Sequence, residues 1–310
     1  MFNVRLFALF WPFLALSAIS QTAPDPGLNV PPGRVRIPVL VTDRQGKPAH
    51  GLQADDFNVL DNGKPTPIEA FLPLSTPSGT QAHFTVFYLD DRRLNMEEMG
   101  SARKDIDAAL SVALDSNGYV AIVTGTSSTN SGFSRDPNQL RQTLASIRAN
   151  AFAEQGTAAH NFDLIGTYSS LADYASRMSK LPGRRLLVVL SPGFSADFPE
   201  IRSAAAVSID RIIQSGVIVN ALNTQDSTSA SVGGDNKVLE ELTSATGGSL
   251  LPNSSSPLTL VQYPELLYLL DISLSAIRAD GSPHQLKVVV NRPGNRVHAR
   301  ESFVAPRSGK

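Results

Sequence analysis

Cysteine is absent from the 310 residues of this chain. Disulfides, thiolate-bound metal sites and cysteine nucleophiles are therefore excluded. An excess of charge of one sign is also lacking, because 27 lysines and arginines face 28 acidic residues, for a net charge of −1. No run rich in lysine and arginine interrupts this balance. The composition thus gives no general attraction to nucleic acid or to an anionic membrane.

The motifs of several enzyme classes are missing as well. The five histidines never occur in the His-x-x-x-His or His-Glu-x-x-His spacing of a zinc site. We expect His284 and His298, in the C-terminal region, to occupy surface or cross-strand positions. No glycine-rich phosphate-binding loop occurs, so nucleotide binding has no support. Ser191 ends an apolar run but lacks the Gly-x-Ser-x-Gly context of a hydrolase nucleophile.

Long apolar runs are absent after the N-terminus. Residues 1–20 combine a positive Arg5, an apolar stretch from Leu6 to Ile19 and small residues before Gln21. This is the layout of a secretory signal peptide. The stretch is shorter than the roughly 20 residues of a spanning helix, and a short retained membrane anchor is the alternative. We therefore predict a secreted or periplasmic protein without a transmembrane helix after signal removal.

The next two segments differ from each other in texture. Residues 21–32 are rich in proline and small residues and indicate a linker. Residues 33–73 are β-rich, and Asp61-Asn62-Gly63 is a strong hairpin signal. We expect strands over 34–42, 56–60 and 67–71. A stretch rich in serine, threonine, proline and glycine from Leu72 to Gln81 indicates the end of this β-rich segment.

Residues 82–263 show a different pattern, in which apolar runs alternate with helical periodicity. Continuous apolar runs are typical of parallel strands that are covered on both faces, and here they lie at 83–90, 118–125, 184–191 and 216–222. Between and after them we expect helices over 96–114, 138–148, 160–179, 201–214 and 237–245. The alternation predicts an α/β fold with a doubly wound, mostly parallel, Rossmann-like sheet.

The C-terminal residues 264–306 are β-rich again. Three strands at each end of the chain are few for an independent sandwich. We therefore predict that the N- and C-terminal segments pair into one β-sandwich, into which the α/β domain is inserted. Two separate small β appendages are the alternative.

Ligand sites of parallel sheets form where the strands end at their C-terminal edge. In this chain those positions carry Asp90-Asp91, Thr124-Gly125-Thr126, Ser191-Pro192-Gly193 and Asn223. The segments FYLDDRRLN, LPGRRLLVVLSPGF and LEELTSATGGSL resemble a von Willebrand factor A domain. Together with VTDRQGKPAHGLQADDFNVLDNGKPTPIEAF and LKVVVNRPGNRVHARESFVAP, they make the chain after the linker similar to the VWFA-related family first described in Acidobacteria.

The resemblance implies a metal-ion-dependent adhesion site made of Asp-x-Ser-x-Ser, a threonine and an aspartate from a third loop. With Asp90 as the first aspartate, Arg92 and Leu94 stand at the two serine positions. Pro192 replaces the third-loop aspartate, and either Thr167 or Thr157 could supply the threonine. The residues left as weak candidate ligands for Mg²⁺ or Ca²⁺ are Asp90, Asp91 and Thr167.

Most of the expected oxygen donors are thus missing. Leucine and proline side chains offer no oxygen, and a guanidinium close to a cation adds repulsion. We predict that the metal site is lost and that no cofactor is bound. Arg92 or Arg93 is expected to pair with Asp90 or Asp91 in place of the metal. For the two aspartates themselves, solvated charge or a helix N-cap before Met96 is the single interpretation that we favour.

Two further segments resemble the family and are expected to form turns. Pro182-Gly183-Arg184-Arg185 is typical of a tight turn with solvated arginines, with docking of an acidic partner as the alternative. Thr246-Gly247-Gly248 is expected to form a tight turn from helix to strand.

The resemblance implies an exported, non-enzymatic protein-binding or adhesion-type module, with a protein partner and no nucleic acid. The partner is expected at the strand-end face, through Asp90, Asp91, Arg92, Arg93, Asn95, Ser191, Phe194 and Asn223. A hydrolase-type enzyme is the first alternative, and it predicts a deep pocket with a perturbed titratable pair at the same edge. A structural subunit of an envelope assembly is the second, and it predicts one large apolar patch.

Overall fold

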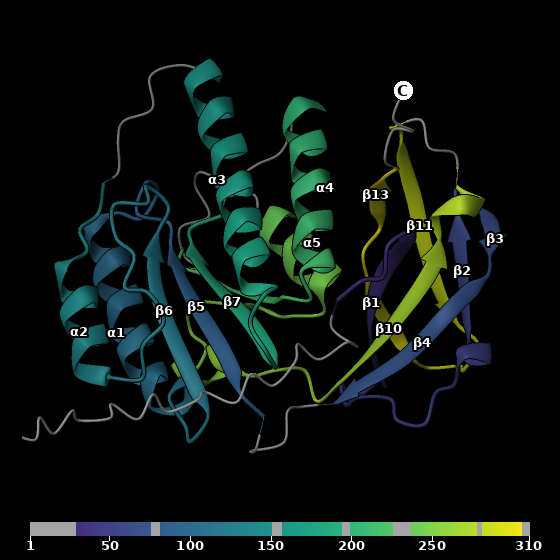
Figure 1. The fold of residues 1–310 in the computed structure, drawn as a ribbon, viewed down its shortest axis with the longest axis horizontal. Helices are drawn as coiled ribbons and strands as arrows, with labels where there is room; N and C mark the ends of the chain where they lie inside the picture. Colours follow the sequence, from purple (N-terminus) through teal and green to yellow (C-terminus); the bar gives the residue numbers. More distant parts are fainter. Residues whose placement is uncertain are drawn as a thin grey trace, which may run out of the picture.

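The computed structural model describes residues 29–75, 81–150, 157–193, 199–225, 237–277 and 281–305. An α/β part lies beside a part made mainly of β-strands (Figure 1). The predicted signal peptide over 1–20, and the linker as far as residue 28, lie outside the described residues. None of the helices described here combines the length and the apolar character that crossing a bilayer requires.

The α/β part is built on one parallel sheet with the strand order β6-β5-β7-β8-β9. Its strands are β5 (His83–Leu89), β6 (Gly118–Thr124), β7 (Arg184–Ser191), β8 (Ile218–Asn223) and β9 (Leu250–Leu251). The four longer strands confirm the four predicted apolar strands. The chain places β6 on one side of β5 and β7 on the other, so the strand order switches direction at β5.

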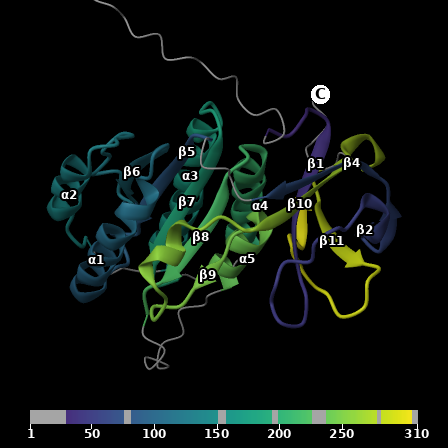
Figure 2. The same cartoon turned by 90° about the horizontal axis from the view of Figure 1, so that it is seen from below.

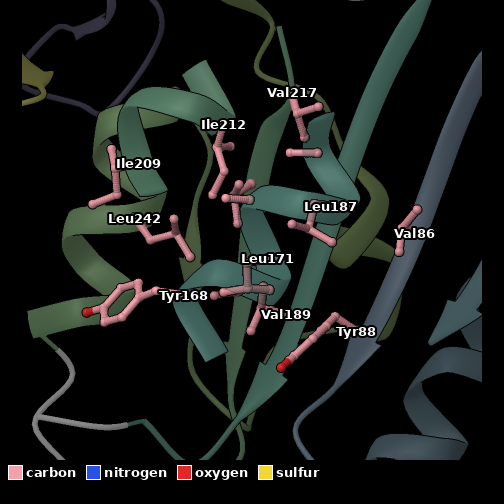
Figure 3. Close-up of a cluster of buried hydrophobic side chains, with 14 of the residues drawn as sticks. Val86, Tyr88, Tyr168, Leu171, Leu187, Val189, Ile209, Ile212, Val217 and Leu242 are labelled. Carbon is pink, nitrogen blue, oxygen red and sulfur yellow. The ribbon is translucent and has the colours of Figure 1, made fainter. Parts of the chain in front are cut away.

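Helices cover both faces of this sheet (Figures 1 and 2). One face carries α1 (Met96–Ala113) and α2 (Pro137–Ser146); the other carries α3 (Thr157–Met178), α4 (Pro199–Gln214) and α5 (Lys237–Thr246). On β5, Val86 and Tyr88 pack toward α3, whereas Phe87 and Leu89 pack toward α1. Figure 3 shows the α3 side of this core. The predicted α/β fold with a helix-flanked parallel sheet is confirmed.

The β part contains two four-stranded antiparallel sheets, in the orders β12-β1-β10-β4 and β13-β11-β2-β3. Strands from before the α/β part are β1 (Arg34–Thr42), β2 (Phe57–Asp61), β3 (Lys64–Thr66) and β4 (Ile68–Ser75). Strands from after it are β10 (Leu266–Ser273), β11 (Pro283–Val290), β12 (Arg296–Ala299) and β13 (Ser302–Val304). Each sheet therefore combines strands from both ends of the described chain. Short 3₁₀ helices occupy Ala54–Asp56, Pro257–Val261 and Leu274–Ala276.

In the β part, the predicted hairpin turn agrees with the structure, but the predicted end of one strand does not. Asn62 and Gly63 have φ of 48° and 79° between β2 and β3, which confirms the predicted hairpin. In contrast, β4 continues through Leu72 and Leu74 to Ser75. The boundary predicted at Leu72 was therefore set too early. Both leucines lie opposite β10, and this long-range pairing outweighs the local loop-like composition.

Arg184 and Arg185, which were predicted to be solvated, are 7% and 1% exposed. Arg185 donates hydrogen bonds to the carbonyl oxygens of Leu181 and Ser215 at 2.7 and 2.8 Å. Arg184 donates to the carbonyl oxygen of Ser75 on β4 at 2.8 Å. The prediction of solvated arginines was wrong because backbone acceptors of neighbouring segments, including the β part, close over the start of β7.

Candidate functional site

The candidate site lies at the C-terminal edge of the sheet, between β5 and β7. Asp90 follows β5, and its backbone N–H donates to the carbonyl oxygen of Leu190 at 3.0 Å, which places it beside Ser191 at the end of β7. The strand order switches direction at β5. A switch point at the carboxyl ends of parallel strands is where ligands of open α/β sheets bind.

Asp90 is fully buried and is held by a guanidinium group and a hydroxyl group. Nη1 of Arg93 contacts Oδ1 and Oδ2 of Asp90 at 3.0 and 3.1 Å. The hydroxyl of Ser191 donates to Oδ2 of Asp90 at 2.7 Å and accepts a hydrogen bond from the N–H of Gly193 at 3.2 Å. Of the pairings that the sequence left open, the structure forms the one between Arg93 and Asp90.

The same guanidinium reaches α3. Nη1 of Arg93 donates to Oγ1 of Thr167 at 3.1 Å, and Nη2 forms an ion pair with Asp163. Arg92 binds the other oxygen of Asp163 at 2.7 Å. Asp163 is a site residue that the sequence analysis missed. It precedes Thr167 by four residues, and this i, i+4 spacing on one helix face is the signal that could have found it.

Asp91 belongs to a separate small network. Its carboxylate accepts hydrogen bonds from the N–H of Thr126 at 2.9 Å and from the Thr126 hydroxyl at 2.5 Å. Its carbonyl oxygen accepts from the N–H of Asn150 at 2.7 Å. Asp91 is 1% exposed. It therefore fixes the loop after β6 against the end of β5.

The favoured interpretation of Asp90 and Asp91, as solvated charge or a helix N-cap, is wrong. Both side chains are buried, and the N-cap of α1 is Asn95. The Asn95 side chain accepts hydrogen bonds from the N–H groups of Glu97 and Glu98, both at 2.9 Å, and the Glu98 carboxylate accepts from the Asn95 N–H. This reciprocal capping box satisfies donors that the first helical turn leaves open.

Burial also changes which predicted residues could meet a partner. Asp90, Asp91 and Ser191 are buried and cannot form a contact surface. The side chain of Arg92 is 41% exposed, and Asn95 is exposed. Asn223 is half-buried and accepts a hydrogen bond from the N–H of Gln225 at 3.0 Å. Phe194 lies outside the described residues.

Two large apolar side chains lie next to this edge and were also missed. Met96, the first residue of α1, is 86% exposed, and Phe162, which directly precedes Asp163, is 81% exposed. Single exposed apolar residues are ordinary on protein surfaces. Here Phe162 is the chain neighbour of Asp163, and Met96 follows Arg93 by three residues, so apolar side chains are exposed close in sequence to the Arg92–Arg93–Asp163 ion-pair cluster.

The electrostatics of the site follow from burial. Removal from water raises the pKa of Asp90, which the Arg93 guanidinium and the Ser191 hydroxyl oppose. Burial also raises the pKa of Tyr88, a residue of β5 that the charges of Asp90 and Arg93 influence. The hydroxyl groups of Tyr88 and Thr224 have no hydrogen-bond partner among the described residues. The backbone N–H of Thr224 donates to the carbonyl oxygen of Ser191 at 3.0 Å.

The residues present do not fit the divalent cation that the family resemblance implies. The Arg93 guanidinium is bound to Asp90, Thr167 and Asp163, so these oxygens already face a positive charge. In the part of the chain that the structure describes, no three histidine, aspartate or glutamate side chains gather in a metal-binding group. Thr157, the other candidate threonine, begins α3, and its side chain is not described.

His284 and His298 belong to the β part and lie away from this edge. His284 of β11 is 5% exposed and stands opposite Phe303 of β13, so the predicted cross-strand position is confirmed. Its Nδ1 lies 2.8 Å from Oδ1 of Asp61. His298 is exposed, as expected for a surface histidine.

No family model and no curated protein matches the chain. Similar solved structures include the conserved hypothetical protein BatB from Bacteroides thetaiotaomicron, at 13% identity over 55% of this chain and 89% of that chain, with a TM-score of 0.37. An aerotolerance-related membrane protein from Bacteroides fragilis is 12% identical over 57% and 93%, with a TM-score of 0.40. The N-terminal domain of TFIIH p34 is 14% identical over 60% and 97%, with a TM-score of 0.36. Scores at this level assign neither a family nor a function, and the von Willebrand resemblance stays a prediction.

Proposed function

We propose that this protein is an exported, non-enzymatic protein-binding module in which a von Willebrand A-like domain is inserted in a β-sandwich formed by both chain ends. The observation that carries the proposal is the Arg93 guanidinium. It is bound by Asp90, Asp163 and Thr167 at the strand edge where a ligand site is expected. Partner binding at this edge would need no metal ion.

The exposed rim supports binding of a protein rather than of a small molecule. Met96 and Phe162 are the most exposed large apolar side chains among the described residues. Phe162 directly precedes Asp163, and Met96 follows Arg93 by three residues. Aromatic and arginine side chains contribute much of the binding energy of protein interfaces. We therefore place the partner contact on Phe162, Met96 and Arg92, above the buried Asp90 and Ser191.

The hydrogen bonds of Ser191 support a non-enzymatic assignment. Its hydroxyl donates to the Asp90 carboxylate and accepts from the Gly193 N–H. A serine nucleophile needs a base, usually histidine, that takes its proton. Among the described residues the hydroxyl is instead directed to a carboxylate that Arg93 neutralises.

The N-terminal sequence pattern supports a partner outside the cytoplasm. A positive residue, an apolar stretch and small residues are the parts of a secretory signal. Proteins outside the cytoplasm often contain disulfides, because their surroundings are oxidising. This chain has no cysteine, so as an exported protein it would contain none. The expected partner is thus a secreted or envelope protein.

Partner capture tests this proposal. The mature protein, Phe162→Ser and Met96→Ser would be incubated with envelope extract, the enriched protein identified, and its Kd measured with each variant. We expect each substitution to weaken binding about tenfold or more, since interface anchors contribute about 1.4 kcal/mol or more. Chelation with EDTA should leave binding unchanged.

A matched control is Val112→Ser, which replaces an exposed apolar residue of α1 near the other end of that helix. It should bind like the parent protein. Equal binding by Phe162→Ser, Met96→Ser and the control would place the partner elsewhere, and loss of binding in EDTA would contradict metal independence.

A further inference from the structure

A groove of about 540 Å³, which we call the α4 groove, lies between α4 and the β part. Figure 1 shows α4 on the side of the α/β part that faces the β-sheets. The N–H of Val304 on β13 donates to Oδ2 of Asp210 on α4 at 3.3 Å, and both residues line the groove. Small-molecule sites have volumes of about 300–1,000 Å³ and are frequent at interfaces between domains. Size and position therefore make the α4 groove a candidate ligand site.

Apolar side chains form one part of its lining. Val207, in the middle of α4, is 48% exposed, and two buried residues of the β part, Val35 and Phe303, also line the groove. A single exposed apolar residue is ordinary. In the α4 groove, however, Val207 adds to apolar residues of a second part of the molecule. The apolar body of a ligand would therefore be removed from water there.

The charged part of the lining is mostly positive. Among the described residues it contains Arg34, Arg36, Arg211 and Arg300 but only one acidic residue, Asp210. Guanidinium groups match the geometry of a carboxylate and can donate two hydrogen bonds to it. The charge of the lining thus favours an anionic ligand.

Two of these arginines are held by partners inside the fold. Arg36 donates to both oxygens of Asp271, at 2.8 and 2.9 Å. Nη2 of Arg300 lies 2.5 Å from Oδ1 of Asp210, and its Nε donates to the carbonyl oxygen of Ser302 at 2.9 Å. The Arg36 and Arg300 side chains are 6% and 2% exposed. They shape the groove, but each already faces a carboxylate of the fold.

The other two arginines are accessible to a ligand. The side chains of Arg34 and Arg211 are 31% and 42% exposed. Their partners, Glu69 at 3.7 Å and Asp173 at 2.6 Å, are exposed as well. Exposed ion pairs contribute little to stability. A carboxylate in the groove can therefore compete with Glu69 and Asp173 for these guanidinium groups.

A second groove between the α/β part and the β part has the opposite character. It lies beside α5, measures about 870 Å³, and its lining includes Glu240, Glu241 and Glu301 together with Lys237 and His298. An anion would be repelled there by three carboxylates. The positive lining is therefore a property of the α4 groove and not of the whole boundary between the two parts.

We propose that the α4 groove binds a small amphiphilic acid, whose carboxylate contacts Arg34 and Arg211. The apolar body of this acid packs against Val207, Val35 and Phe303. Phosphate or sulfate would leave the apolar side chains uncovered, and a neutral apolar molecule would leave both arginines unused. Among the described residues, the groove shares none with the strand-edge site, so this proposal is independent of the proposed function.

Calorimetric titration of the mature protein with octanoate tests the proposal. We expect one site per chain with a Kd of about 0.1 mM or tighter, and binding that weakens as the salt concentration rises. Octan-1-ol has the apolar body without the charge, and acetate has the charge without the body. Each should bind at least about tenfold more weakly than octanoate.

The variant Arg34→Ser/Arg211→Ser should bind octanoate about tenfold more weakly or worse, because hydrogen bonds from guanidinium to carboxylate are charge-assisted. Its matched control is Arg141→Ser/Arg292→Ser, which makes the same change of charge and removes one exposed ion pair from each part of the molecule. This control should bind octanoate like the wild type. All four side chains are partly exposed, so both variants should fold, and thermal unfolding checks this.

Val207→Glu tests the apolar side of the groove. It adds a negative charge beside the expected ligand and should also weaken octanoate binding about tenfold. Val112→Glu changes a valine of α1 with similar exposure and should leave octanoate binding unchanged.

Several results would overturn the proposal: no saturable octanoate binding, equal binding of octan-1-ol, or either groove variant binding like its control. A hexapeptide with an apolar end and a free C-terminal carboxylate, if bound more tightly than octanoate, would contradict a small-acid ligand. Partner capture is measured with Phe162→Ser and Met96→Ser, so failure of this proposal leaves the proposed function standing.

Discussion

The two parts of the molecule each contain a buried arginine–aspartate pair, and the pairs are built differently. In the β part, Arg36 of β1 lies directly opposite Asp271 of β10, with Nε–Oδ1 and Nη2–Oδ2 distances of 2.8 and 2.9 Å. In the α/β part, Asp90 and Arg93 are three residues apart at a strand end. The first pair matches one guanidinium to one carboxylate, whereas Arg93 also binds Asp163.

The difference separates a structural pair from a site. A bidentate pair inside a sheet matches two N–H groups of one guanidinium to the two oxygens of one carboxylate. At the strand edge the guanidinium is shared between two carboxylates and a hydroxyl, so no partner depends on it alone. Buried ion pairs are weak evidence for stability, and breaking one by removing a single partner is strongly destabilising. The cost of breaking each pair should therefore tell them apart.

The largest effect is expected for Arg36→Ala. The Asp271 carboxylate is 3% exposed in the wild type, and the substitution removes its partner. The loss should lower the unfolding free energy by about 3–5 kcal/mol. Urea denaturation at pH 7 measures it. The control is Arg36→Met/Asp271→Leu, in which no charge is left buried, and it should recover most of the loss. A loss below about 1 kcal/mol in Arg36→Ala would show that the pair is not a structural element.

Asp90→Asn should cost less, below about 1 kcal/mol at pH 7, although Asp90 is more buried than Asp271. Burial raises the pKa of Asp90, so folding favours the neutral form of this carboxyl group. In Asp90→Asn, Arg93 also retains its ion pair with Asp163. A folded-state pKa above the unfolded value means that the folded protein binds the proton more readily. Wild-type stability should therefore gain from this group as pH falls from the folded pKa toward 3.8.

That gain should be missing in Asp90→Asn, so the stability difference between the two proteins should change in favour of the wild type as the pH is lowered. Urea denaturation at several pH values between 7 and 4 measures it. A cost equal to that of Arg36→Ala, independent of pH, would show instead that ionised Asp90 is a structural partner of the same kind.

The two pairs also show what the sequence could predict. FYLDDRRLN places an arginine within three residues of Asp90, so a pairing there was expected from local spacing. Arg36 and Asp271 are 235 residues apart, and no local pattern connects them. Asp163 has a local signal, its spacing of four residues from Thr167, but its pairing with Arg93 was missed because α3 meets the end of β5 only in the folded chain. Thr167 was found only through the family resemblance.

The fold was more predictable than the site because its signals are local. The apolar runs at 83–90 and 184–191 match β5 and β7 nearly residue for residue. Asn62-Gly63 determines a hairpin through backbone conformation alone. In contrast, β9 has two residues, too few for any period to show. Burial of Asp90, Arg184 and Arg185 depends on what packs over the sheet edges, which local patterns do not contain.

A third test asks whether the loop that carries Arg93 depends on the cap of α1. Asn95→Ala removes the acceptor for two N–H groups and should cost about 1 kcal/mol. Asp136→Ala removes the N-cap of α2, which accepts from the Asn138 N–H at 2.9 Å far from either pair, and should cost about the same. Thermal unfolding of both variants checks this. A clearly larger loss for Asn95→Ala would mean that the cap also positions Arg93.

The smallest effect is expected for a surface pair of the β part, Asp56 with Arg292, at 2.9 Å. The Gln53 backbone N–H and Arg292 lower the pKa of Asp56. A lowered folded-state pKa stabilises the fold above the unfolded pKa of about 3.8, and this contribution is lost as pH falls through the folded pKa. Asp56→Asn can still accept from Gln53, so it isolates the charge. Its stability should lie slightly below that of the wild type at pH 7, equal it near pH 2, and approach it in high salt. A stability difference that neither salt nor pH changes would show that Asp56 acts through hydrogen bonding. Only the buried pairs, among those compared, would then act through charge.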